Sequence, residues 1–114
     1  MTTALSLLNL VPLRAGQNSK QAIDAAVRLA QFTESLGYTR YWIAEHHNTP
    51  NLASSATQLL IGHVLSQTQS IRIGSGGVML PNHSPLMVAE QYGTLATLYP
   101  HCCRFAPSFL PSAL

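Results

Sequence analysis

Three adjacent residues with titratable side chains, Glu45, His46 and His47, directly follow the apolar run YWIA at residues 41–44. An imidazole changes its charge near neutral pH, so it suits proton transfer or a hydrogen bond to a developing anion. Three interpretations are open: a site at the end of a strand, a surface or capping cluster, and a metal site. Because successive side chains of an extended segment point in opposite directions, three consecutive residues rarely bind one ion, and no metal is expected here.

A second unusual segment, GSGG at residues 74–77, has three glycines in four positions. A dinucleotide-binding loop would need a further glycine where the chain has Met79, and the Gly-Lys-Ser/Thr ending of a phosphate loop is missing. Glycine permits a bulge, a positive φ, or the close approach of a flat ligand to the backbone. A plain turn and a ligand-binding surface are therefore both compatible with this segment.

The elements that position these two segments follow from the hydrophobic pattern. Three runs rich in apolar, aromatic and branched residues predict strands: 4–11, 38–44 and a third that covers either 71–74 or 71–80. Each run is followed by a segment with helical periodicity: 19–36, about 54–67 and 85–99. Residues suited to capping stand at the starts of these helices: Asn18 or Ser19, Ser54 or Ser55, and Ser84.

Strand and helix alternate three times, which predicts an α/β fold with parallel strands, right-handed crossovers and outer helices. In such folds, chemistry gathers at the carboxyl ends of the strands. Residues 45–47 follow the second strand and residues 74–77 follow or interrupt the third, so the two segments are expected side by side on one rim. His63 falls within the second helix and His83 in a loop, and structural roles are expected for both.

The overall composition excludes several kinds of partner. The chain is 46% hydrophobic and 9% charged with a formal charge of +2, and it has no basic cluster of the kind that binds nucleic acid. So few charges suggest a sheet covered on both faces. No apolar run approaches the roughly 18 residues that span a membrane, and no signal peptide is recognisable, so a cytoplasmic location is expected. The adjacent Cys102 and Cys103 imply no disulfide framework.

The Glu45-His46-His47 sequence, together with IGSGGVMLPNHSP at residues 73–85, closely resembles the bacterial luciferase-like flavin monooxygenases. The resemblance covers residues 4–100. It implies a flavoprotein with a TIM (β/α)8 barrel, of which this chain holds the first three βα units. It also implies an oxidoreductase that uses reduced FMN and dioxygen on a small organic substrate, with a flavin reductase as the source of reduced FMN.

The resemblance also implies roles for individual residues. His46 matches the family's catalytic histidine, which assists proton transfer beside the flavin. Gly76 and Gly77 match a pair of small cofactor-binding residues joined by a non-prolyl cis peptide beneath the isoalloxazine ring. His47 matches a position that is often histidine and is expected among the cofactor-binding residues.

The pattern ends after Pro100. Residues 1–100 are expected to form the N-terminal part of the barrel domain, and residues 101–114 (HCCRFAPSFLPSAL) an aberrant tail where a fourth strand is due. A shifted reading frame or an assembly error is one hypothesis for this tail. A chain of three units is expected to leave sheet edges open and to bind FMN weakly or not at all. The alternative function is a non-catalytic fragment or a subunit that completes its sheet by association.

Overall fold

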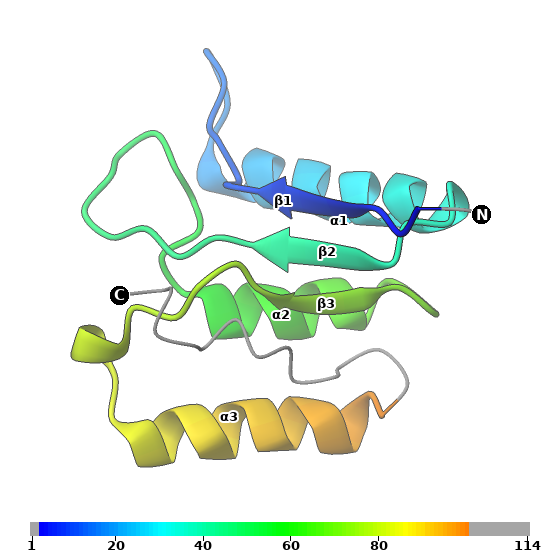
Figure 1. The fold of residues 1–114 in the computed structure, drawn as a ribbon. Helices are drawn as coiled ribbons and strands as arrows, with labels where there is room; N and C mark the ends of the chain where they lie inside the picture. The colour runs from blue at the N-terminus through cyan, green and yellow to red at the C-terminus, as the bar shows by residue number, and fades with distance from the viewer. Residues whose placement is uncertain (1–2, 101–114) are drawn as a thin grey trace.

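The computed structural model describes residues 3–100, and the expected tail at 101–114 lies outside them. The described chain forms three parallel strands and three α-helices in strict alternation, in the strand order β1-β2-β3. Helices α1 and α2 lie on one face of the sheet, and α3 lies beyond β3 beside α2 (Figure 1). The elements are β1 Ser6–Asn9, α1 Ser19–Ser35, β2 Arg40–Ile43, α2 Thr57–Leu65, β3 Arg72–Ser75, the 3-10 helix η1 Leu80–Asn82, and α3 Pro85–Leu98.

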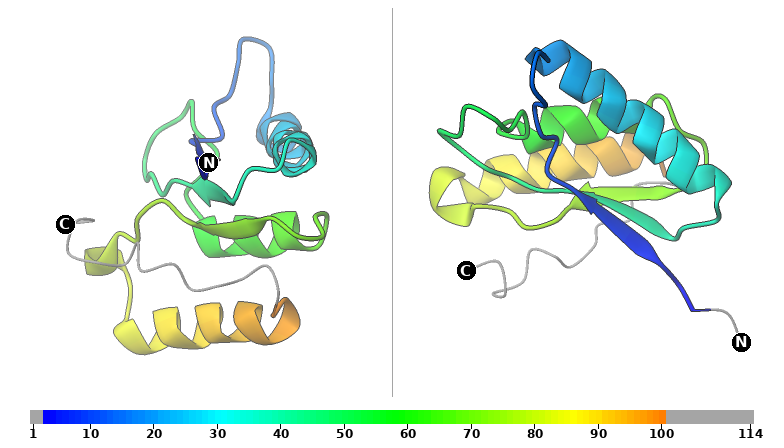
Figure 2. Two further views of the ribbon diagram at one scale, coloured as in Figure 1. Left: turned by 45° about the vertical axis from the view of Figure 1, so that its right-hand side comes forward. Right: turned by 90° about the horizontal axis from the view of Figure 1, so that it is seen from above.

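The two faces of the sheet differ in their cover. Leu7, Tyr41 and Ile73 pair side by side across the strands. Tyr41 and Ile73 belong to the hydrophobic core beneath the helices, and the partly buried Leu7 packs against it. The next row, Leu8 with Trp42, points to the opposite face, where the side chain of Leu8 is 55% exposed. The expectation of cover on both faces is therefore wrong for residues 3–100 (Figure 2). Right-handed crossovers place successive helices on one side, which leaves the other side bare.

The buried Tyr41 hydroxyl connects the sheet to α1. It donates a hydrogen bond to the Ala26 carbonyl at 3.0 Å and accepts one from the Asn9 side-chain amide at 2.6 Å. Burial raises the pKa of Tyr41, and the Asn9 hydrogen bond opposes that rise. A satisfied hydroxyl at this depth fixes the position of α1 over β1 and β2 without leaving a buried polar group unpaired.

Both ends of α1 are held by side chains. Asn18 and Gln21 form a capping box, each side chain accepting the other residue's backbone N–H at 2.9 Å, as the sequence predicts for Asn18. Near the other end, one oxygen of Glu34 accepts the backbone N–H groups of Gln69, Ser70 and Ile71 at 2.7–2.9 Å. This carboxylate therefore fixes the end of α1 to the start of β3.

The start of α2 differs from the sequence prediction. The helix begins at Thr57 with Ala56 at the cap position, not at Ser54 or Ser55. The Ser54 hydroxyl donates instead to the Leu10 carbonyl, 3.1 Å away, which holds the loop after β2 against the end of β1. Among the described residues, no helix is long and apolar enough to cross a membrane.

Candidate functional site

The loops that follow β2 and β3 leave the sheet at the same rim. The backbone N–H of Gly76 donates to the carbonyl of Ile43, the last residue of β2, at 2.8 Å. Figure 1 shows the connections that follow β2 and β3 leaving the sheet on the same side. The parallel pairing confirms the expectation that residues 45–47 and 74–77 come together at the carboxyl ends of the strands.

At this rim, the carboxylate of Glu45 is buried, with its side chain only 1% exposed, and it gathers three partners. Its Oε2 lies 2.6 Å from Nε2 of His47 and 2.9 Å from Nε2 of His83. Its Oε1 accepts the backbone N–H of Met79 at 3.2 Å. One side chain therefore fastens the loop after β2 to the segment around η1.

The protonation of this cluster follows from the bonds of Glu45. Burial raises the pKa of Glu45, but hydrogen bonds from His47, His83 and the Met79 N–H outweigh burial and bring the pKa below its ordinary value. The carboxylate is therefore ionised at neutral pH and can only accept hydrogen bonds. Each imidazole must then carry a proton on the Nε2 that faces it.

His46 points away from this cluster, because its side chain lies on the opposite side of the extended backbone from its two neighbours. Its backbone N–H donates to the Ser54 carbonyl at 3.2 Å, while its exposed imidazole bonds to no other described residue. It lines an open depression of about 430 Å³ with Asn48, Thr49 and Ser55. The arrangement fixes the backbone of His46 and leaves its ring available to a ligand.

The glycine segment has a constrained backbone. Gly77 has a φ of +144°, a value that side-chain-bearing residues rarely adopt, and the Ser75 hydroxyl donates to its carbonyl. A Cβ added to Gly76 would lie 2.6 Å from Cδ1 of Leu8. The expected cis peptide between Gly76 and Gly77 is wrong for this structure, since no peptide bond among the described residues is cis. The trans form is the intrinsically favoured one for a non-prolyl bond.

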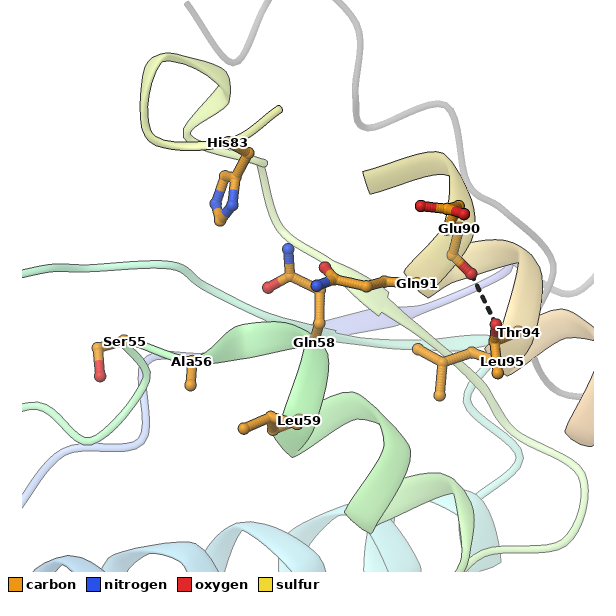
Figure 3. Close-up of a pocket in the computed structure, with 9 residues that line it drawn as sticks. All are labelled: Ser55, Ala56, Gln58, Leu59, His83, Glu90, Gln91, Thr94 and Leu95. Atoms are coloured by element: carbon orange, nitrogen blue, oxygen red, sulfur yellow. Dashed lines mark hydrogen bonds between the residues drawn. The ribbon is translucent and has the colours of Figure 1, made fainter. Parts of the chain in front are cut away.

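A second cavity, of about 540 Å³, lies between α2 and α3 on the helical side of the sheet. Figure 3 shows Gln58 of α2 and Gln91 of α3 in the space between the two helices, with His83 at one end. The cavity does not include His46 or Gly76, so it is separate from the site that the sequence predicts.

Sequence reasoning placed His46, His47, Gly76 and Gly77 on one rim but missed two members of the cluster. The sequence places Glu45 at the end of the second strand but gives it no bond to another loop, and it predicts a structural role for His83 without naming a partner. The separation of 38 residues between Glu45 and His83 hides their contact. The available signal was that both residues follow neighbouring parallel strands.

Residues 3–100 match the family described as luciferase-like monooxygenase. The chain belongs to this family. A luciferase-like monooxygenase of Escherichia coli K12 is 54% identical over 99 residues, which cover 87% of this chain and 30% of the relative. The N-acetyl-S-alkylcysteine monooxygenase of Bacillus subtilis is 42% identical over 96 residues, which cover 84% of this chain and 29% of the relative.

Solved structures of luciferase-like proteins agree with the fold. Apo-MsnO8 superposes with a TM-score of 0.84 at 39% identity, covering 87% of this chain and 30% of that chain. The oxygenating constituent of 3,6-diketocamphane monooxygenase from Pseudomonas putida, in complex with FMN, has a TM-score of 0.78 at 23% identity, covering 86% and 27%. The chain therefore contains the first three βα units of the TIM-barrel luciferase-like fold, and it spans about 30% of the length of these relatives.

Proposed function

We propose that this chain supplies part of the active site of an FMN-dependent monooxygenase that acts on a small organic substrate. The observation that carries the proposal is the placement of an available imidazole, His46, and a side-chain-free backbone, Gly76, on one rim of a parallel sheet in a luciferase-like chain. A structural neighbour in complex with FMN supports the choice of cofactor. A flavin reductase would supply the reduced cofactor.

The residues present fit the ring of a flavin better than its phosphate. Gly76 is exposed, and the atom nearest to its missing side chain is the end of Leu8, a half-exposed side chain that can rotate away. A flat ring can therefore approach the backbone. The described arginines of the strands, Arg40 and Arg72, stand at the opposite, amino ends of β2 and β3, away from this rim.

In this proposal, each residue of the site has a separate role. Bound reduced FMN supplies the reaction of the site with dioxygen. His46 holds or moves a proton at its imidazole. Gly76 and Gly77 offer backbone to the face of the ring. His47 is held by the ionised Glu45, which fixes the orientation of its ring beside the cofactor.

A chimera tests this proposal directly. Residues 3–100 would replace the matching segment of the Bacillus subtilis N-acetyl-S-alkylcysteine monooxygenase, whose named substrate allows the product to be measured. We expect the chimera to bind FMN and to oxidise its substrate. His46→Gln should lower turnover about 100-fold or more while FMN fluorescence quenching stays unchanged. Full turnover by the H46Q chimera would contradict the role of His46.

The 114-residue chain by itself is expected to bind FMN more weakly than about 1 µM, because its three βα units supply only part of the barrel mouth that would hold the cofactor. Fluorescence titration of purified chain with FMN measures this affinity. A tighter complex would show that these residues hold the cofactor without further barrel units.

One observation favours association as a second function. Leu5, Leu8 and Leu10 are 51%, 55% and 37% exposed, and β1 and β3 both have a free edge within the described sheet. Exposed apolar surface and unpaired strand edges favour pairing with another chain. Size-exclusion chromatography with an absorbance scan separates the two functions: a soluble yellow species supports the enzyme, and a colourless aggregate supports the non-catalytic alternative.

A further inference from the structure

The cluster formed by Glu45, His47 and His83 has the composition and geometry of a metal site. One oxygen or nitrogen atom from each side chain lies within 4.8 Å of the other two. The objection to a metal at three consecutive residues does not apply here. Glu45 and His47 are two positions apart on an extended backbone and so face the same side, and His83 arrives from the neighbouring loop.

We infer that Glu45, His47 and His83 bind a divalent first-row transition ion of the Zn²⁺ type. Two imidazoles and one carboxylate form a common ligand set for Zn²⁺, with the fourth position left to water. This inference goes beyond the proposed monooxygenase function. The metal site shares Glu45 and His47 with the proposed flavin site, but metal binding can be measured without FMN, so its failure and the failure of the proposed function are distinguishable.

The burial of the three side chains suits such a site. Glu45 is 1% exposed, while His83 and His47 are 20% and 38% exposed, so the ion would meet a buried charge on one side and solvent on the other. The Met79 N–H holds Oε1 of Glu45 and leaves Oε2 directed at both imidazoles. A hydrogen bond of this kind orients a metal ligand and strengthens its binding.

The two distances between the Glu45 carboxylate and the imidazoles need only small changes to admit the ion. Bonds of about 2.0–2.2 Å in a tetrahedral arrangement place ligand atoms roughly 3.3–3.5 Å apart. The Oε2–Nε2 distances of 2.6 Å to His47 and 2.9 Å to His83 must therefore widen slightly. Both imidazoles are partly exposed and can shift. Each would bind through an unprotonated Nε2, and its proton would move to Nδ1.

Isothermal titration of the untagged, EDTA-treated full chain with Zn²⁺ tests the inference. We expect one ion per chain, a Zn²⁺-dependent rise in melting temperature, and a visible absorption band when Co²⁺ is used instead. His83→Gln and, separately, His47→Gln should weaken binding by about tenfold or more. The half-exposed His47 provides a second variant that keeps the test decisive if H83Q does not fold.

Two matched controls identify the ligands. His63→Gln changes an exposed histidine on α2 and should bind Zn²⁺ like the parent. The double variant C102S/C103S removes the only thiols of the sequence and should also keep its affinity. Loss of binding in C102S/C103S, or unchanged binding in both H83Q and H47Q, would overturn the inference. So would the absence of any heat of binding in the parent chain.

Discussion

At the scale of single residues, the fold depends strongly on the carboxylate of Glu45, which joins the segments that follow β2 and β3. Glu45→Gln replaces a charged acceptor with a neutral amide that cannot accept from His47, His83 and the Met79 N–H together. We expect the free energy of unfolding to fall by about 1–3 kcal/mol. Urea denaturation followed by circular dichroism measures this loss. His46→Gln, at the exposed neighbouring position, is the matched control and should change stability little.

The same carboxylate makes stability depend on pH. Its pKa in the folded chain lies below the ordinary value of 4.5 that applies after unfolding. The unfolded state therefore binds this proton more readily, so the contribution of Glu45 is complete above about pH 4.5 and is lost as the pH falls through the lower folded pKa. We expect the stability difference between parent and E45Q to shrink in this acid range. A difference that stays constant down to about pH 3 would contradict this assignment.

The two adjacent glycines should respond differently to alanine. Gly77→Ala places a side chain on a backbone with a φ of +144°, so we expect a loss of about 1–3 kcal/mol. Gly76→Ala brings its new methyl group against the movable end of Leu8, so its cost should stay below about 1 kcal/mol. Thermal unfolding of both variants gives the comparison. If both variants lose the same free energy of unfolding, crowding by the new methyl group, and not backbone conformation, determines the cost of alanine in this segment.

At the scale of elements, Glu34 connects the end of α1 to the start of β3 through three backbone N–H groups. Burial raises the pKa of Glu34, but these bonds together lower it below the ordinary value. Glu34→Gln should destabilise the chain by about 1–2 kcal/mol, because charge-assisted bonds are replaced by weaker ones. Chemical denaturation measures the loss.

Asp24→Asn is a suitable comparison for E34Q, since it removes only the exposed ion pair with Lys20 on the surface of α1. Exposed pairs of this kind contribute little, so no resolvable change is expected. A loss in D24N as large as that in E34Q would mean that general charge effects, and not the three backbone bonds, stabilise the chain.

The type and order of the strands and helices can largely be predicted from the sequence. Alternating periodicity predicts the parallel βα units, and local chemistry predicts the Asn18 cap, because both signals lie within a few residues. The start of α2 was missed because the Ser54 hydroxyl bonds to Leu10, 44 positions away. His83 was missed for the same reason. Contacts between loops depend on which strands pair, and the order of residues within one segment does not predict that pairing.

At the scale of the whole molecule, the face of the sheet opposite α1 and α2 should control self-association. Leu8 is 55% exposed there, and the end of its side chain lies next to the position that a Cβ on Gly76 would occupy. Leu8→Lys adds a charge to this apolar face, so we expect a smaller sedimentation coefficient or less aggregate with little loss of helical signal. If L8K associates as strongly as the parent, the strand edges, and not this face, control self-association.

The outer edge of β3 has a further consequence. A further strand added parallel to β3 would continue the pairing pattern that joins β2 and β3. Such a parallel strand would place its carboxyl end on the same rim as Gly76. The sheet, extended in this way, would gain a further strand end on the rim that carries His46 and Gly76.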